Sequence, residues 1–401
     1  MRIRTTVTLL LLILLVSPAA ARDWLVPGEV ATIAAAMDSA TAGDAVIVAC
    51  GTYEEHSISV ASGITLRSET GLPNCVTIDA GQAGRNLVCD KVDENTVIIG
   101  FTLVGGHGDD GGALYCQSGN GPRVEFCVFD GAVSASGGGA VYCFGVANMI
   151  MLDCRFQGNE VQQGNGGAVY AHASTTTFTN CQFIGNTAQG DGGGMIVVEG
   201  SFTLNSCTFE QNNAGNYGGG LLTDTAAGGM ADCQVIDNIA GVSGGGGSFG
   251  WAEVSLFGST FSGNEAVGSG GGGMRTQGYS TITATECTFS GNSATSGAGI
   301  KAGSDLTLID CYVNANAASS GAGAVSLFGD LHLEAENVDF LNNSAPDNAG
   351  GFIPENSTAY LRCCEVVEED WRFWSAITLN NEGCDVADET TNWGSVKAAY
   401  R

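Results

Sequence analysis

Basic residues are scarce in this 401-residue sequence. Fourteen Lys and Arg face 42 Asp and Glu, which gives a formal net charge of −28. Proteins that bind nucleic acid draw most of their affinity from Lys and Arg side chains that neutralise phosphates. We therefore expect no nucleic-acid partner, and the simplest interpretation of the acidic excess is a solubilising surface that repels polyanions.

Long apolar runs are scarce too. The one run near the amino terminus, residues 7–16, follows Arg2 and Arg4 and precedes the small residues 19–21. It is shorter than the ~20 residues of a membrane-spanning helix, and the arrangement is typical of a secretory signal peptide, which we predict over residues 1–21. The mature chain is then expected to be extracytoplasmic, secreted or associated with the cell surface or outer membrane, without a transmembrane segment.

Proline is rare, with six residues against 61 glycines. So many glycines would indicate disorder in a chain poor in apolar residues, yet 44% of this sequence is hydrophobic. The composition therefore predicts a folded core with many tight turns. Sequence motifs for zinc binding, phosphate-binding loops and nucleophile elbows are absent, so we predict no metal site and no cofactor.

Cysteine, by contrast, is plentiful. An exported chain can form disulfides, which a reducing cytosol would disfavour. Because the 15 cysteines are an odd number, at least one thiol stays free or pairs with another molecule. The pairing is left open by the sequence, but Cys363, Cys364 and Cys384 lie in a terminal segment where a disulfide is favoured.

One motif, C-x-F-x-x-N, recurs along the chain. It is complete at residues 154–159, 181–186, 207–212 and 287–292. Substituted or degenerate copies of the motif begin at Cys127, Cys233, Ser259, Cys311 and Val338. When all the copies are taken together, each begins 24 to 28 residues after the one before it. A second element, Gly-Gly followed by a small and an aliphatic residue, keeps the same step. Self-similarity at a fixed period indicates a repeat architecture.

Apolar residues alternate within each repeat, which is the signal of a strand. Met149 and Met151 lie two apart, and so do Cys154 and Phe156. The step of three between Met151 and Cys154 breaks the alternation, so a corner must separate two strands. With a third strand after the Gly-Gly element, each repeat of about 26 residues predicts one coil of an all-β parallel β-helix with three strands per coil.

Stacking of coils about 4.8 Å apart assigns structural roles to the repeated residues. The phenylalanines are expected to form an internal aromatic stack, and the cysteines a column of buried thiols. The asparagines are expected at a turn, where Asn tolerates a left-handed backbone and its amide can bond along the ladder. The three sets include Phe156, Phe183 and Phe209; Cys127, Cys154, Cys181, Cys207 and Cys233; and Asn159, Asn186, Asn212, Asn238, Asn264, Asn292 and Asn316.

The ends of such a solenoid need covers, because open strand edges invite pairing with other chains. Residues 30–40 suit a short amphipathic helix lying over the first coil. We therefore expect an N-terminal cap at residues 22–45, a parallel β-helix at 46–355, and a C-terminal cap or attachment segment at 356–401 that contains three of the five tryptophans.

Two family resemblances rest on these motifs and together cover about residues 30–355. The opening, Thr32-Ile33 through Gly43-Asp44 to Gly51-Thr52-Tyr53, resembles the start of pectin-lyase-like right-handed β-helix proteins. That resemblance implies a right-handed coil and brings polysaccharide lyases and hydrolases into view. The paired Gly-Gly-Ala-hydrophobic and Phe-x-x-Asn motifs resemble repeats of the polymorphic outer-membrane-protein family, which implies a surface-exposed domain linked to adhesion.

A row of aromatic residues is the best candidate site. Tyr115, Tyr142 and Tyr170 hold the same place in three consecutive strands, and His172 lies two residues after the last of them. An exposed aromatic row on a rigid sheet can stack sugar rings or anchor a protein. We predict these four residues as the binding site; the alternative is a row covered by a loop or explained by strand propensity alone.

Few residues are candidates for catalytic groups, and we assign no catalytic residue. Asp110 and Asp191 hold equivalent turn positions but lie three coils apart, about 14 Å, which is too far for a conventional glycosidase pair. Arg275 and Lys301 occupy matching outward positions in adjacent coils, with no acidic cluster beside them in the repeat frame. Exposure to solvent is the simplest interpretation of both.

These features favour a non-enzymatic, adhesin-like or glycan-binding β-helix. The expected partner is an extracellular glycan or a cell-surface protein. Two alternatives stay open: a carbohydrate-active enzyme, lyase or hydrolase, with the pectin-lyase-like fold, and a passive structural scaffold. Exposure of the tyrosines would favour binding, whereas a cleft in which acids converge with a basic residue would favour catalysis.

Overall fold

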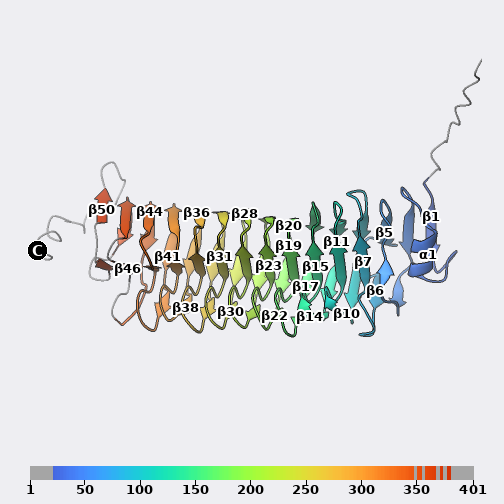
Figure 1. The fold of residues 1–401 in the computed structure, drawn as a ribbon, viewed down its shortest axis with the longest axis horizontal. Coiled ribbons are helices and arrows are strands. Elements are labelled where there is room, and N and C mark those ends of the chain that lie inside the picture. The colour runs from blue at the N-terminus through green and yellow to red at the C-terminus, as the bar shows by residue number, and fades with distance from the viewer. Residues whose placement is uncertain (1–20, 347–349, 355–356, 367–370, 374–376, 381–401) are drawn as a thin grey trace, which may run out of the picture.

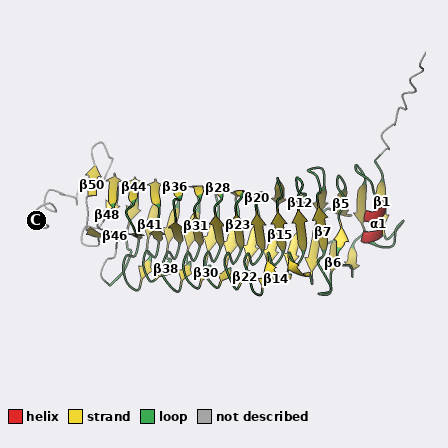
Figure 2. Cartoon of the chain, viewed as in Figure 1, coloured by secondary structure: helices red, strands yellow, loops and turns green. Residues whose placement is uncertain are grey.

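The computed structural model describes residues 21–346, 350–354, 357–366, 371–373 and 377–380, so the predicted signal peptide lies almost wholly outside the described residues. The chain winds into a long rod of stacked coils (Figure 1) built from strands, with one short helix at its start (Figure 2). The described part of the chain has no helix long and apolar enough to cross a membrane.

Three parallel sheets run the length of the described rod and a fourth, shorter sheet runs along its middle; the rod is a right-handed parallel β-helix as predicted. From β8 (Val97–Ile99) to β43 (Val325–Leu327) each coil passes through sheets A, B, D and C in turn and then enters sheet A of the next coil; the described coils before and after these have no strand in sheet D. Sheet A has 15 strands. They are β1 (Asp23–Val26), β2 (Ala45–Val48), β5 (Thr65–Ser68), β8 (Val97–Ile99), β12 (Arg123–Glu125), β16 (Met149–Leu152), β20 (Thr175–Thr179), β24 (Ser201–Asn205), β28 (Ala227–Ala231), β32 (Glu253–Phe257), β36 (Thr281–Thr285), β40 (Asp305–Ile309), β44 (His332–Glu336), β47 (Thr358–Arg362) and β50 (Ile377–Asn380).

Sheet B follows the corner that carries the cysteine column and has 13 strands. They are β3 (Gly51–Tyr53), β6 (Val76–Asp79), β9 (Phe101–Val104), β13 (Val128–Asp130), β17 (Arg155–Gln157), β21 (Gln182–Ile184), β25 (Thr208–Glu210), β29 (Gln234–Ile236), β33 (Thr260–Ser262), β37 (Thr288–Ser290), β41 (Tyr312–Asn314), β45 (Asp339–Phe340) and β48 (Glu365–Val366). Its central residues point inward and form the aromatic stack.

Sheet C follows the Gly-Gly element and carries the predicted tyrosine row on its outer face. Its 13 strands run in register. They are β4 (Ile58–Ser59), β7 (Leu87–Asp90), β11 (Leu114–Gln117), β15 (Val141–Phe144), β19 (Val169–His172), β23 (Met195–Val198), β27 (Leu221–Asp224), β31 (Gly247–Gly250), β35 (Met274–Gln277), β39 (Ile300–Ala302), β43 (Val325–Leu327), β46 (Gly351–Ile353) and β49 (Trp371–Phe373).

Sheet D is additional to the three strands per coil that the sequence predicts. Seven of its nine strands follow the asparagine turn, and each of these seven has two residues. Two residues cannot display an alternating pattern, so no periodicity marks them in the sequence. They are β10 (His107–Asp110), β14 (Val133–Gly137), β18 (Glu160–Val161), β22 (Thr187–Ala188), β26 (Asn213–Ala214), β30 (Ile239–Ala240), β34 (Glu265–Ala266), β38 (Ser293–Ala294) and β42 (Ala317–Ala318).

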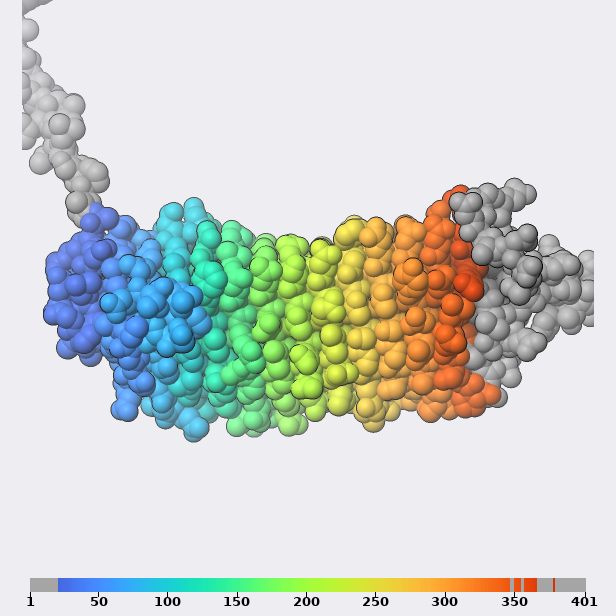
Figure 3. Space-filling model, turned by 180° about the vertical axis from the view of Figure 1, so that it is seen from behind, coloured from blue at the N-terminus to red at the C-terminus, as the bar shows by residue number. Residues whose placement is uncertain are grey.

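The interior confirms the predicted stacks. Phe156 lies face to face with Phe183 at 4.8 Å between ring centroids, and Phe183 with Phe209 at 4.4 Å. All are fully buried, and each such side chain contributes about 1.5–3 kcal/mol of hydrophobic free energy. The space-filling view shows the coils as bands in close contact along the rod (Figure 3).

The asparagine ladder is confirmed, but its left-handed residue is not the asparagine. The Nδ2 of Asn186 donates to Asn212 Oδ1 at 2.9 Å and to a carbonyl of the preceding coil. The positive φ falls one residue earlier, at Gly185 (61°) and Gln211 (56°). The earlier residue turns the chain, which leaves the following asparagine free to place its amide in the interior.

The two glycines of the Gly-Gly element are required for different reasons. Gly192 has a φ of 66°, a region that L side chains rarely adopt. At position 193 a side chain would not fit, because its Cβ would lie 2.4 Å from the carbonyl oxygen of Gly219 in the next coil. The first glycine makes the turn, and the second allows the coils to approach.

The two ends of the rod differ from the expected boundaries. The helix α1 (Ile33–Ser39) lies within the predicted range, and Thr32 caps it by accepting a hydrogen bond from the N–H of Ala35. Strand β1 precedes α1 and pairs with β2, so the ladder already begins inside the segment 22–45. At the other end strands continue through β47 and β50, beyond residue 355. Trp374 and Trp393 of this segment lie outside the described residues.

Candidate functional site

Strands β11, β15 and β19 place the predicted tyrosines side by side on the outer face of sheet C. Tyr115 pairs in register with Tyr142, and Tyr142 with Tyr170. Each follows a buried aliphatic residue and precedes a buried one, so the alternation of the strand directs the ring outward. We call these three residues the tyrosine row.

The rings of the tyrosine row stack on one another. Their centroids are 5.7 and 5.3 Å apart, and the ring planes deviate by 5° and 14°. The guanidinium of Arg85 lies 4.8 Å from the Tyr115 centroid and covers the free face at that end. Because neighbouring groups occupy the ring faces, the row presents ring edges and hydroxyls; the hydroxyl of Tyr115 donates to Gln117 Oε1 at 2.9 Å.

The turn between sheets D and C lies against the tyrosine row and half buries it. A Cβ on Gly137 of this turn would be 3.2 Å from Cδ2 of Tyr142. Burial, and after it the nearby Asp110 carboxylate, raises the pKa of Tyr142 to about 12. Burial also raises the pKa of Tyr170. The row is therefore partly covered by a loop and partly open to a ligand.

His172 lies beside the row, so the structure brings all four predicted residues together. Its ring meets Phe144 edge to face at 5.2 Å and Tyr170 at 6.4 Å. Its Nε2 is 3.3 Å from Oε2 of Glu199, one coil further along. Glu199 is thus a site residue that the sequence did not identify, because nothing in the repeat distinguishes it from other outward acids.

Beyond Tyr170 the same outward column changes character. Ile196 and Leu222 occupy the next two positions and are buried at 3% and 8% exposure, because the turns of sheet D cover them. Arg275 and Lys301 follow further along. Buried residues therefore separate the tyrosine row from the partly exposed Arg275 and Lys301.

A second group of polar side chains gathers where Arg275 reaches back along the column. Its guanidinium carbon lies 4.7 Å from the Tyr217 ring centroid, and Asp191 Oδ1 accepts a hydrogen bond of 3.1 Å from the N–H of Tyr217. Burial raises the pKa of the Asp191 carboxyl, Asp224 raises it further, and Arg275 and the hydrogen bond oppose the rise. We call these four residues the acid–arginine cluster.

The acid–arginine cluster corrects the expectation that Arg275 has no acid near it. The repeat frame compares residues at equal positions, whereas the long Arg275 side chain spans two coils to reach Tyr217. Its Nη1 is buried and has no hydrogen-bond partner among the described residues. Lys301 instead donates to the carbonyl of Ser269 at 2.5 Å. The separation of Asp110 and Asp191 by three coils is confirmed, with Gly137 and Asn165 between them.

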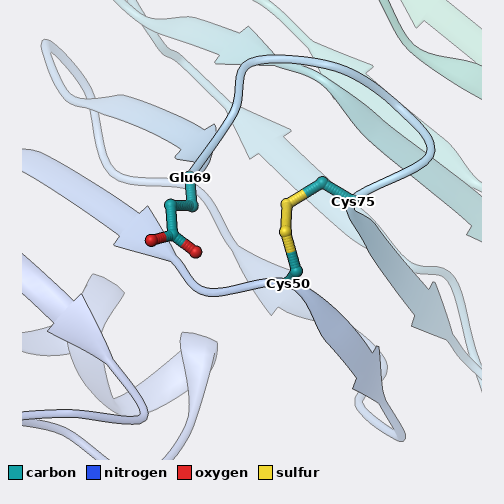
Figure 4. Close-up of side chains that lie close together, drawn as sticks. All are labelled: Cys50, Glu69 and Cys75. Carbon is teal, nitrogen blue, oxygen red and sulfur yellow. A yellow bond between two sulfur atoms is a disulfide. The ribbon is translucent and has the colours of Figure 1, made fainter.

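Cys50, Glu69 and Cys75 bring three atoms of metal-ligand type within 4.8 Å of one another near the start of the rod. Figure 4 shows the two sulfurs joined in a disulfide, with the Glu69 carboxylate beside it. The disulfide links the first two coils, with 4.5 Å between Cα atoms. A metal binds thiolates, which a disulfide does not offer, so this group is a covalent clamp in the oxidised protein.

Comparison with known proteins places this geometry in a family. A family model described as "Right handed beta helix region" matches residues 86–256 and 252–388. Among solved structures, a polygalacturonase from Erwinia carotovora ssp. carotovora is similar over 94% of this chain and 99% of that chain, with 12% identity and a TM-score of 0.36. A search of curated proteins found no match. The family match includes the coils that carry both the tyrosine row and the acid–arginine cluster.

Proposed function

Since this chain belongs to the family of right-handed β-helix proteins, we propose that it is an extracytoplasmic glycan-binding protein. Its ligand lies along the outer face of sheet C. The observation that carries the proposal is the half-open tyrosine row, in register on a rigid sheet with His172 beside it. The Cys50–Cys75 disulfide supports an oxidising compartment.

The chemistry of the row favours a glycan over an apolar partner. Tyrosine hydroxyls, the Gln117 amide, the His172 ring and the Glu199 carboxylate supply both donors and acceptors, which sugar hydroxyls need. Ring edges between these groups supply apolar contact at intervals of about 4.8 Å. An extended chain lying along the rod would meet the same kind of contact in each of three coils.

The acid–arginine cluster supports a second candidate, a carbohydrate-active enzyme. Asp191 has a raised pKa, a second carboxylate in Asp224 within electrostatic reach, and the cation of Arg275 nearby. A carboxyl with a raised pKa beside another carboxylate is the arrangement that general acid catalysis uses. The cluster lies on the same face of sheet C as the tyrosine row, so one glycan could reach both.

The test uses the mature protein on a glycan array, together with an assay of polysaccharide depolymerisation. We expect binding without cleavage, and a loss of at least tenfold in affinity for a variant with Tyr115, Tyr142 and Tyr170 all changed to Ala, because both hydroxyls and ring edges are removed. The control is Tyr279→Ala, which removes a tyrosine that is 94% exposed on another part of the rod. It should bind like the parent protein.

Three outcomes separate the candidates. Binding that survives the triple substitution contradicts the tyrosine row as the binding site. Cleavage that is abolished by Asp191→Asn, with binding retained, establishes the enzyme instead. Absence of both binding and cleavage across polysaccharide classes contradicts a carbohydrate ligand altogether.

A further inference from the structure

An open groove of about 630 Å³ lies along the corner where sheet C passes into sheet A, directly after the tyrosine row. His172 of the row faces Glu199 of the groove across 3.3 Å, so the two surfaces are continuous. Small, acidic and aromatic residues line the groove, among them Ala173, Gly200, Ala226, Glu199, Glu253 and Trp251.

Trp251 forms the end wall, and the fold does not require a tryptophan there. Its backbone has a φ of 46°, which is unfavourable for a bulky residue. Equivalent corners share the positive φ and hold smaller or polar residues: Gly145, Ala173, Glu199, Thr225 and Gly278. Even so, the side chain is 52% exposed, so it does not serve the core. A strained, exposed aromatic that packing does not explain is a mark of a functional surface.

The indole is held in place on one side only. A Cβ on Gly278 of the next coil would come within 2.7 Å of Cε2, so the ring lies directly against that glycine. Its other side borders the groove. One face is thus fixed by the protein, and the other is available as a platform for a ligand.

The charge of the groove is uncompensated. Its lining contains Glu199 and Glu253 and no Lys or Arg. Within the described residues Glu253 has no hydrogen bond or ion pair, and the one basic neighbour of Glu199 is His172. Hydroxyls of Thr175 and Ser201, 3.0 Å apart, lie at the Glu199 end of the groove, and Glu253 lies two coils beyond Ser201.

We propose that this groove binds a hexosamine residue with a free, protonated amino group. The inference rests on the proposed glycan-binding function and specifies the sugar. A cation is attracted both to the face of an indole and to a carboxylate without a partner, such as that of Glu253. The apolar face of the sugar ring lies on Trp251, with its ammonium group beside Glu253 of the same coil. Neighbouring residues of the same glycan lie along the groove toward Ser201 and Glu199.

The same geometry excludes the other common classes of charged or acylated sugar. A uronate carboxylate would meet two glutamates on a protein of net charge −28, and like charges repel. An N-acetylated hexosamine has no charge to pair with the carboxylates. We therefore expect the free amine to be preferred over both.

The experiment titrates the mature protein with oligomers of glucosamine, N-acetylglucosamine and galacturonate by calorimetry at low salt. The glucosamine oligomer should bind at least tenfold more tightly than the N-acetylglucosamine oligomer, and the galacturonate oligomer should not bind. Trp251→Ala should weaken glucosamine binding about tenfold and Glu253→Gln about fivefold. Ala173 occupies the equivalent corner, so alanine is compatible with the backbone at position 251.

Matched controls remove an exposed aromatic and an exposed acid outside the groove. Tyr279→Ala and Glu160→Gln should leave the affinity within twofold. Equal affinity for the amino and N-acetyl oligomers, or full binding by Trp251→Ala, overturns the inference. If other glycans still bind through the tyrosine row in that case, the proposed function stands and only the sugar assignment fails.

Discussion

Eight described asparagines carry the hydrogen bonding of one corner of the rod. Each Nδ2 from Asn159 to Asn316 donates to the Oδ1 of the next asparagine and to a backbone carbonyl of the preceding coil, at 2.8 to 3.1 Å. All eight are buried. A buried polar group costs free energy unless it is paired, so the ladder stabilises only as an unbroken series.

Replacement of one member should therefore be costly. Asn212→Ala leaves the amide of Asn186 and the carbonyl of Phe183 without their partners. We expect the free energy of unfolding to fall by about 3 kcal/mol, since each unsatisfied buried group costs about 1–3 kcal/mol. Chemical denaturation followed by circular dichroism measures the change. Asn213→Ala, at the adjacent exposed position, is the control; equal effects at both positions would contradict the ladder's role.

The polar side chains of the cysteine column are also buried and hydrogen-bonded. The thiol of Cys207 donates to the carbonyls of Phe178 and Asn205, and in a coil where Ser259 replaces the cysteine its hydroxyl donates to Phe257 at 2.9 Å. A small buried side chain fills this corner in every one of these coils, and Val338 does so without a donor. Burial raises the pKa of Cys127 to about 12 and that of Cys364 to about 11, so these thiols are unreactive in the folded protein.

The sequence predicts the interior at this scale but not every contact on the surface. Inward residues repeat with the coil, so Phe183 and Cys207 could be assigned from spacing alone, and the structure confirms them as a stacked ring and a free buried thiol. Cys363 is disulfide-bonded, in the segment where a disulfide was favoured. The pairing of Arg275 with Tyr217 depends on the length and direction of one side chain, which spacing does not encode.

At the scale of elements, the start of the rod depends on Asp44. Its carboxylate accepts hydrogen bonds from the N–H groups of Arg22 (2.8 Å) and Thr41 (2.9 Å) and from the indole of Trp24 (3.2 Å). These bonds tie β1 and the end of the helical segment to the beginning of β2. They favour the ionised form, led by the Thr41 bond, and lower the pKa of Asp44 to about 2.

The cap should accordingly loosen in acid. Because the pKa is about 2 in the folded protein and 3.8 ordinarily, the carboxylate stabilises the fold fully above about pH 4, and that stabilisation is lost as the pH falls through about 2. Thermal unfolding of the parent protein and of Asp44→Asn should differ most near pH 6 and converge toward pH 2. A difference that does not depend on pH would contradict this account.

Short elements are also where the sequence was least informative. Strand β1 has four residues and no preceding repeat to match, so it could not be separated from the cap. The two-residue strands of sheet D are recognisable only because β22 and its neighbours pair in register. The position of such a short strand is determined by the neighbouring strands with which it pairs, because its own sequence is too short to show an alternating pattern.

At the scale of the molecule, each coil contacts chiefly the coils before and after it. All the sheets are ordered by chain position, with no strand inserted out of sequence. The stability of such a solenoid is approximately a sum of coil terms and interfaces between neighbours. Coils of similar length and identical corners are therefore interchangeable units.

Removal of one whole coil should be tolerated. Deletion of residues 207–232 joins Ser206 to Cys233 and preserves the corner, because Ser206 and Asp232 have φ values of 52° and 54°. We expect a cooperative unfolding transition with a midpoint within about 5 °C of the parent protein. The control deletes residues 207–219, which removes β25 and β26 but keeps β27 and β28. It should fail to fold, as judged by circular dichroism and proteolysis; equal behaviour of the two deletions would contradict the modular account.

The order of the strands within the sheets also determines how the rod would respond to a tensile load. Strand β1 lies at one end of the rod and β50 at the other (Figure 1), and hydrogen bonds between coils run along the line that joins them. Tension between the ends would open these bonds in series, so coils would peel from an end one after another instead of shearing together. Each would release about 26 residues, roughly 90 Å of extended chain. The molecule would then yield in small steps at low force while the remaining coils stayed folded.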